Sequence, residues 1–207
     1  MQEKDFTKMK RRGVCLIIAA PSGTGKSTLC KSLLSNHAEL QLSISATTRQ
    51  PRPGEVDGRD YYFYTKEDFK NLIQNEGLIE WAQVYENYYG SPRAPIEKAL
   101  SEGRDILMDL DWQGFRQMKA LFPKDVVGLF LLPPSLKALE ERLRNRSSDS
   151  DDVIQSRMKK AESEISHWNE FDFLIVNDDL QVAEKAVETV LKSSRYAINR
   201  FQEEISC

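Results

Sequence analysis

Four short apolar runs alternate along the chain with segments of helical periodicity. The runs span Val14–Ala20, Ile106–Leu110, Val126–Leu132 and Phe173–Val176. Each run is almost continuously hydrophobic, which is typical of parallel strands that are buried on both faces. Strands that alternate with helices predict an α/β fold built on a doubly wound parallel sheet. In such sheets, ligands bind at the carboxyl ends of the strands.

The helical segments are recognised by apolar residues spaced three or four positions apart. Ala94–Leu100 and Gly114–Leu121 are two such segments. Leu136–Leu143 is a third, with Ser135 in the N-cap position. The clearest helix lies near the C-terminus, and its apolar stripe consists of Leu180, Ala183, Val187, Val190 and Leu191.

Two stretches interrupt this alternation. Residues 42–95 mix short β-like runs, aromatic residues and turn residues, which indicates a small lobe inserted into the sheet domain. Within it, Lys66–Asn75 is expected to form a helix, with Thr65 as its N-cap and Asp68 three residues later. Residues 142–170 carry many charges of both signs and few apolar side chains, which favours a mobile lid. We therefore expect a single domain, with a core of residues 13–41, 96–141 and 171–207.

Composition excludes several classes of function. The chain has 207 residues, is 40% hydrophobic and 29% charged, and carries a formal net charge of -3. These values fit a soluble globular domain without a global basic field for nucleic acid. The apolar runs are too short to span a bilayer, so no membrane association is expected. The basic cluster Lys8–Arg12 lacks the features of an export signal and is interpreted as a solvated arm before the first strand.

Cysteine and histidine usage points to a reduced, zinc-free protein. Cys15, Cys30 and Cys207 are odd in number and scattered, which favours free thiols in the cytoplasm over a disulfide framework. His37 and His167 lie far apart and have no cysteine partners, so no zinc site is expected.

A glycine-rich turn follows the first apolar run and leads into the helix-compatible segment Thr28–Leu34. The turn consists of Ala20, Pro21, Ser22, Gly23, Thr24, Gly25, Lys26 and Ser27. Strand, glycine-rich turn and helix are the context of a phosphate-binding loop, in which backbone N–H groups surround phosphate oxygens. Lys26 would contact the outer phosphates, and the Ser27 hydroxyl would ligate Mg²⁺. Ala20 replaces the first glycine of G-x-x-x-x-G-K-[ST], and a plain turn before a helix is the structural alternative.

The most specific motif lies in the predicted lobe. It reads S-x-T-T-R-x-P-R-x-G-E from Ser45 to Glu55. Three further segments are D-Y-Y-F at 60–63, I-E-W-A at 79–82 and N-Y-Y-G-S at 87–91. This order and spacing closely resembles the guanylate kinase family, which phosphorylates GMP with ATP, from about Val14 to about Leu191. The resemblance implies a P-loop three-layer sandwich with a parallel sheet core, a GMP-binding lobe over residues 42–95 and a lid over residues 142–170.

Arg49 and Arg52 are candidates for a phosphate clamp. They are three residues apart, and prolines follow Gln50 and Arg52. An extended, polyproline-like segment would place both guanidinium groups on one side. Spacing alone fits two solvated loop arginines equally well, and the resemblance favours the clamp. Tyr61 and Tyr89 can donate hydrogen bonds to the same phosphate, pack within the lobe, or do both.

Glu80 is the candidate for recognising the base. Its apolar segment, between Ile79 and Trp81, would by composition alone place it as a solvent-facing strand residue. The resemblance implies that it faces guanine, whose N1–H and 2-amino group can both donate to one carboxylate. Adenine has an acceptor at N1 and no 2-amino group, so it would leave the carboxylate unpaired. The resemblance also assigns Ser45 to the base O6 and Ser91 to the base or the phosphate.

Asp109 and Asp111 follow the second apolar run. Residues two apart share one face of a strand, so both carboxylates can point the same way. The resemblance implies that Asp109 contacts substrate or metal-bound water. For Asp111, the same role and the N-cap of the next helix remain open.

The predicted lid contains three candidate arginines. Arg142 and Arg146 are four apart and share a helix face, and Arg157 follows on the next segment. A salt-bridged surface is the ordinary reading of such residues, whereas the resemblance implies that they close over the ATP phosphates. Ser147 stands where the family usually has glycine, which leaves the geometry of the lid turn open. Asn177 matches a position near adenine and could equally cap the final helix.

The resemblance implies transfer of the terminal phosphoryl group of ATP to GMP, and to dGMP, with Mg²⁺ as cofactor. The implied catalytic residues are Lys26, Arg49, Arg142, Arg146 and Arg157. The implied ATP-binding residues are Ala20–Thr28 and Asn177, and the implied GMP-binding residues are Ser45, Arg49, Arg52, Tyr61, Glu80, Tyr89, Ser91 and Asp109. The alternatives are an inactive protein-binding module of the same fold and a kinase for another nucleoside monophosphate. Intact loop residues argue against the first alternative, and Glu80 argues against adenine.

Overall fold

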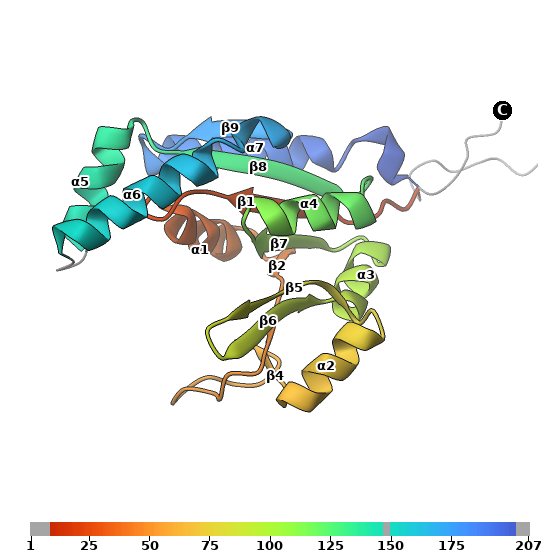
Figure 1. Ribbon diagram of the computed structural model, residues 1–207. Coiled ribbons are helices and arrows are strands. Elements are labelled where there is room, and N and C mark those ends of the chain that lie inside the picture. Colours follow the sequence, from red (N-terminus) through yellow and green to blue (C-terminus); the bar gives the residue numbers. More distant parts are fainter. Residues whose placement is uncertain (1–8, 147–149, 202–207) are drawn as a thin grey trace, which may run out of the picture.

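The computed structural model describes residues 9–146 and 150–201, and two sheets organise it (Figure 1). The central sheet is entirely parallel, in the strand order β2-β7-β1-β8-β9. Its strands are β1 (Cys15–Ala19), β2 (Leu40–Leu42), β7 (Asp105–Asp109), β8 (Val126–Leu132) and β9 (Phe173–Val176). The predicted α/β fold with a parallel sheet core is confirmed.

Helices cover both faces of the central sheet. One face packs on α1 (Lys26–Asn36) and α7 (Leu180–Ser194), and the other packs on α3 (Arg93–Ser101) and α4 (Trp112–Leu121). Alternate residues of β1 supply the two cores, because Leu16 belongs to the first hydrophobic cluster and Ile17 to the second. The result is a layered arrangement of helices, sheet and helices.

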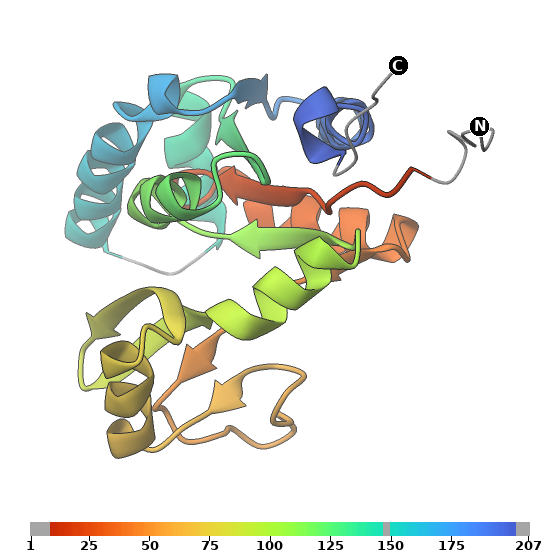
Figure 2. The same ribbon diagram turned by 90° about the vertical axis from the view of Figure 1, so that its right-hand side faces the viewer.

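The second sheet lies below the central sheet in Figures 1 and 2 and has the strand order β4-β3-β6-β5. Its strands are β3 (Ala46–Thr47), β4 (Tyr62–Phe63), β5 (Leu78–Val84) and β6 (Asn87–Pro92). The helix α2 (Lys66–Gln74) packs Phe69 against this sheet and begins at Thr65, whose hydroxyl accepts from the Asp68 backbone N–H at 3.0 Å, as predicted. Figure 2 shows α3 leading from the second sheet to the central sheet.

Two further helices, α5 (Leu136–Arg146) and α6 (Asp151–Ile165), lie side by side at one end of the central sheet (Figure 1). A separate cluster of buried residues, which includes Leu143 and Met158, holds them together. The Ser135 hydroxyl accepts from the Ala138 backbone N–H at 3.0 Å, as expected of the N-cap of α5. No helix within residues 9–146 and 150–201 has the length and hydrophobicity needed to cross a membrane.

One strand prediction is wrong in its burial. The segment Phe173–Val176 forms β9, but three of its four side chains are exposed, with 42% for Phe173, 43% for Leu174 and 50% for Val176. Composition gives no position within a sheet, and β9 is the edge strand beyond β8. The short strand β2, at the other edge, was not predicted from the sequence.

The interpretation of the basic N-terminal cluster as a solvated arm is wrong for Arg11 and Arg12. Arg11 donates to the carboxylate of Asp105 at 2.8 and 3.2 Å. Arg12 donates to the carboxylate of Asp125 at distances from 2.6 to 3.1 Å. Both carboxylates are buried, and a buried charge requires a partner. The segment therefore anchors the amino-terminal end of the central sheet.

Candidate functional site

The glycine-rich loop between β1 and α1 has the backbone conformation of a tight turn. Gly23 and Gly25 have φ angles of 93° and 100°, in the region that favours glycine. Gly25 is also the N-cap of α1, and a Cβ atom there would lie 2.6 Å from Nδ2 of Asn177. Only glycine satisfies both conditions, and the loop leaves the first N–H groups of α1 at its surface.

The loop forms one wall of a pocket of about 640 Å³ at the carboxyl end of the central strands. Asp109 and Asp111 come from the end of β7, Arg142 from α5 and Glu164 from α6. The loop residues that line it are Ala20, Pro21, Ser22, Gly23, Gly25, Lys26, Ser27 and Thr28. The volume and the backbone donors fit a polyphosphate.

Asp109, the last residue of β7, and Asp111, two residues later, have different contacts. The ammonium of Lys26 forms an ion pair with the carboxylate of Asp109. Asp111 is the N-cap of α4, and its Oδ1 accepts from the backbone N–H groups of Gln113 at 3.0 Å and Gly114 at 2.9 Å. Asp111 also lines the pocket, so it has the capping role that the sequence left open and lies beside the site as well.

Asn177 is buried against the back of the loop. Its Nδ2 donates to the backbone carbonyl of Thr24 at 2.7 Å, and the backbone carbonyl of Asn177 accepts from both Nη atoms of Arg142 at 3.2 Å. The alternative that Asn177 caps the final helix is wrong, because Asp179 is the N-cap of α7 and accepts from two backbone N–H groups of its first turn. Asn177 therefore ties the loop to Arg142.

The other two lid arginines are less closely placed. Arg157 is half-buried on α6, and it is not among the residues that line the pocket. Arg146 is the last residue of α5, and Ser147 lies outside the described residues. Glu164 lines the pocket instead, and burial raises the pKa of its carboxyl. Sequence reasoning missed Glu164, although it follows Arg157 by seven residues, which is two turns of one helix.

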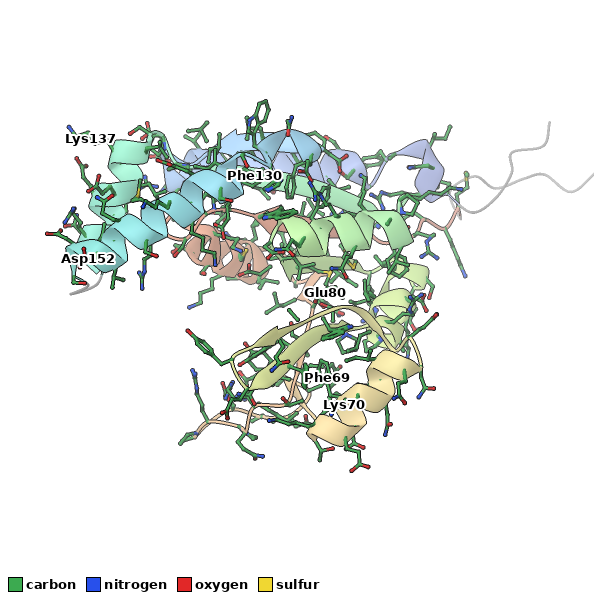
Figure 3. All side chains as sticks on the ribbon, viewed as in Figure 1. Phe69, Lys70, Glu80, Phe130, Lys137 and Asp152 are labelled. Atoms are coloured by element: carbon green, nitrogen blue, oxygen red, sulfur yellow. The ribbon has the colours of Figure 1, made fainter. Side chains whose placement is uncertain are left out.

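Glu80 and Ser91 meet on adjacent strands of the second sheet. The Ser91 hydroxyl donates to Oε1 of Glu80 at 2.6 Å. Figure 3 shows Glu80 on the side of β5 that faces the central sheet, and β5 contacts α4 there. Burial raises the pKa of Glu80, and the negative charge of Asp111 acts in the same direction. The reading of Glu80 as a solvent-facing strand residue is therefore wrong.

The loop between β3 and β4 holds Arg49 through several contacts. Its guanidinium donates to both carboxylate oxygens of Glu55 at 2.9 Å and to the Gln50 carbonyl at 2.8 Å. It also lies over the rings of Tyr61 and Phe63, at 5.3 and 5.8 Å from their centroids. Hydrogen bonding to Glu55 raises the pKa of Arg49.

The remaining candidates lie around Arg49 and in the neighbouring strands. The rings of Tyr61 and Tyr89 meet edge to face with centroids 6.3 Å apart. Arg52 is exposed, and its backbone N–H donates to Glu55 at 2.7 Å. The Ser45 carbonyl accepts from the backbone N–H of Tyr62 at 2.9 Å. The structure thus brings Arg49, Tyr61 and Tyr89 together in one lobe with Glu80 and Ser91.

The pocket also has the donor chemistry for a hard cation. Ser27, Asp109, Asp111 and Glu164 bring hydroxyl and carboxylate oxygens to one pocket, and oxygen ligands are those that Mg²⁺ prefers. In the part of the chain that the structure describes, no three His, Cys, Asp or Glu residues form a metal site of their own. A cation here would therefore need ligands from a bound molecule.

Comparisons with known proteins agree on one family. The family model described as guanylate kinase matches residues 12–194. A guanylate kinase from Gluconobacter oxydans is 50% identical over 195 residues, which cover 94% of each chain. One from Maricaulis maris is 49% identical over 186 residues, covering 90% of this chain and 85% of the relative. The crystal structure of guanylate kinase from Anaplasma phagocytophilum superposes with a TM-score of 0.72 at 34% identity, covering 93% of this chain and 92% of that one.

Proposed function

The chain belongs to the guanylate kinase family, and we propose that its two sheets hold the two nucleotides of a single phosphoryl transfer. It is an enzyme that phosphorylates GMP with ATP as donor. ATP binds at the loop of the central sheet, and GMP binds at the second sheet. The observation that carries this assignment is the half-buried Glu80 carboxylate, which is oriented by Ser91 and faces the central sheet.

On the ATP side, the loop and its neighbours bind the phosphates. Residues 20–28 surround the phosphate oxygens, to which the backbone N–H groups of Gly23, Gly25, Lys26 and Ser27 donate, with the N-terminus of α1 behind them. Lys26 leaves Asp109 to contact the outer phosphates, and Arg142 adds a second positive charge from α5. Asn177 contacts both the loop and Arg142, which supports its assignment to the ATP site.

In the GMP site, different residues bind the phosphate and recognise the base. Arg49 and Arg52 bind the phosphate, with the hydroxyl groups of Tyr61 and Tyr89 beside them. Glu80 accepts from N1–H and the 2-amino group of guanine. Ser45 contacts O6, Ser91 orients Glu80, and Asp109 lies between the two sites. This recognition includes dGMP, because none of these contacts requires the 2′-hydroxyl.

Catalysis follows from positioning and charge. The attacking group is a phosphate oxygen of GMP, so no side chain has to act as a strong base. Lys26 and the lid arginines Arg142, Arg146 and Arg157 neutralise the charge that develops on the transferred group. Mg²⁺, held by Ser27 and the nucleotide phosphates, supplies further positive charge when it is bound.

We assign residues 42–95 as the GMP-binding lobe and residues 142–170 as the lid. The remaining core consists of residues 13–41, 96–141 and 171–207. The lobe lies between β2 and β7 in the chain, and the lid lies between β8 and β9. Closure of both onto their nucleotides excludes water, which would otherwise accept the phosphoryl group. We also propose a role in guanine nucleotide metabolism in the cytoplasm, and the free, buried thiols of Cys15 and Cys30 fit a reducing compartment.

Neither alternative is favoured. An inactive protein-binding module would not need the intact glycine conformations at Gly23 and Gly25. AMP would leave the Glu80 carboxylate without the adjacent N1–H and 2-amino donors that guanine presents. An ADP-release assay with GMP, dGMP, AMP, CMP, UMP and dTMP distinguishes these functions. We expect turnover with the two guanine nucleotides, and equal turnover with AMP would contradict the assignment of Glu80.

A further inference from the structure

Glu55 ends the S-x-T-T-R-x-P-R-x-G-E motif and contacts both arginines of that motif. Its carboxylate accepts from Arg49 Nη1 and Nη2 at 2.9 Å each and from the backbone N–H of Arg52 at 2.7 Å. Its own backbone N–H donates to the Arg52 carbonyl at 3.0 Å. One carboxylate therefore joins the two arginines that are assigned to the phosphate of GMP.

The contacts of Arg49 divide its guanidinium into two edges. Glu55 takes one hydrogen from each Nη atom at the end of the fork, and the Gln50 carbonyl takes the second hydrogen of Nη1. A guanidinium carries five N–H donors in a rigid plane. Neither of these partners uses Nε–H or the second hydrogen of Nη2, which lie on the same lateral edge. Such an edge matches two oxygens of a phosphate. Hydrogen bonding to Glu55, and then to Tyr89, raises the pKa of Arg49, so the Tyr89 hydroxyl, which is itself assigned to the phosphate, lies beside this guanidinium.

The position of Arg49 is fixed from its flat side as well. The guanidinium lies over Tyr61 and Phe63, at 5.3 and 5.8 Å from the ring centroids. The side chains of Arg49 and Glu55 are 16% and 20% exposed, so the pair is shielded from most of the solvent. Hydrogen bonding to Arg49 lowers the pKa of Glu55, which keeps the carboxylate ionised at neutral pH.

We propose that Glu55 is a positioning residue for GMP, which holds the lateral edge of Arg49 toward the phosphate and sets the distance between Arg49 and Arg52. The proposal rests on the proposed function, in which this lobe binds GMP. With Glu55 ionised, the cluster of two arginines and one glutamate keeps a net positive charge. A dianionic phosphate is therefore attracted to a side chain that is already ordered. Ordering a long side chain before binding removes part of the entropic cost of binding.

The opposite role would be an internal competitor, in which the Glu55 carboxylate occupies the place of the phosphate. The two roles predict opposite changes in GMP affinity when Glu55 is removed. A competitor has to leave before GMP binds, so its removal tightens the binding of GMP. A positioning residue stays in place, so its removal weakens the binding of GMP. The lateral edge of Arg49 favours the positioning role, because the phosphate and Glu55 can bind the same guanidinium together.

The test uses Glu55→Gln and Glu55→Ala in the full chain. For both variants we expect the KM for GMP to rise by roughly three- to tenfold, the factor that corresponds to ordering one long side chain. The KM for ATP stays unchanged. Guanosine, which lacks the phosphate, serves as the second probe, and its Kd measured by NMR titration should equal that of the wild type. A structural role for Glu55 would instead weaken guanosine and GMP by the same factor.

The matched control is Asp60→Asn. Asp60 lies in the same loop and also accepts from an arginine and a backbone N–H, those of Arg59 at 2.8 Å and Val56 at 2.8 Å. Within the described residues, its hydrogen bonds and ion pair go to Val56 and Arg59, and Glu55 acts on it through charge alone. Its replacement should therefore leave the KM for GMP nearly unchanged. An unchanged or lower KM for GMP in the Glu55 variants overturns the positioning role. If the wild-type protein binds GMP no more tightly than guanosine, the assignment of this lobe to GMP fails as well.

Discussion

Replacing Glu80 by glutamine tests directly whether the Glu80 carboxylate recognises the guanine base. In the wild type, Oε1 of Glu80 accepts from the Ser91 hydroxyl at 2.6 Å, and the carboxylate has acceptor capacity left for N1–H and the 2-amino group. Glutamine keeps one acceptor and presents an NH₂ group to a guanine donor. A hydrogen bond to a charged group contributes about 1.5–3 kcal/mol, so we expect the Kd for GMP to rise by roughly 10- to 100-fold.

The same substitution should stabilise the unliganded protein. Burial raises the pKa of Glu80, so the folded protein binds this proton more tightly than the unfolded chain does. The stability contributed by this group is present at acidic pH and is lost as the pH rises through the folded-state pKa. Glutamine carries no charge at any pH. The variant should therefore have a higher Tm than the wild type at neutral pH, and the difference should vanish on acidification.

The assay combines GMP titration with thermal unfolding between acidic and neutral pH. In the wild type, GMP affinity should fall on acidification at a higher pH than an ordinary glutamate would give, and this dependence should be absent from Glu80→Gln. Glu86→Gln, an exposed residue in the turn between β5 and β6, is the control. A variant that binds GMP as tightly as the wild type, or loses ATP to the same extent, would refute the placement of Glu80 against the base.

Three other substitutions test the remaining parts of the molecule. Lys26→Met should abolish turnover and change the stability by no more than about 1 kcal/mol, because its pair with Asp109 is partly exposed; residual turnover in a steady-state assay contradicts this. Gly25→Ala should weaken ATP and spare GMP in binding titrations, because its Cβ would lie 2.6 Å from Nδ2 of Asn177 at a φ of 100°. Asp105→Asn should lower the free energy of unfolding in urea by about 3 kcal/mol, because it leaves the partly buried Arg11 and Arg195 without their buried counter-charge. An unchanged urea midpoint would contradict this expectation.

The order of elements could be predicted from the sequence because each signal is local. Continuous apolar runs gave the positions of β1, β7, β8 and β9, and the capping residue Thr65 gave the start of α2. The place of a strand within the sheet depends on pairing across the fold, which no local pattern encodes. For this reason the exposure of β9 was mispredicted and the three-residue strand β2 was missed.

The same distinction applies to the candidate site: its local motif could be predicted from the sequence, and its long-range contacts could not. The glycine-rich loop could be predicted because glycine, lysine and serine at fixed spacing have few other uses. The partners of charged residues could not be predicted, because they are set by tertiary distance. Arg11 pairs with Asp105, which is 94 residues away in the sequence. Glu164 lines the pocket, but nothing in the sequence distinguishes it from the other charged residues of α6.

Lys26 and Arg49, which are assigned to the phosphates of ATP and GMP, each pair with a carboxylate, but the two pairs differ in geometry. The ammonium of Lys26 is a compact charge at the end of a flexible stem, so the carboxylate of Asp109 and a phosphate draw it toward different positions. The guanidinium of Arg49 is a rigid fork with separate edges, so Glu55 can occupy one edge while a phosphate occupies the other. We therefore expect Lys26 to move when ATP binds, and Arg49 to be ordered for GMP before it binds. The identity of each cation, and not its charge alone, decides whether the neighbouring carboxylate opposes the ligand or prepares its site.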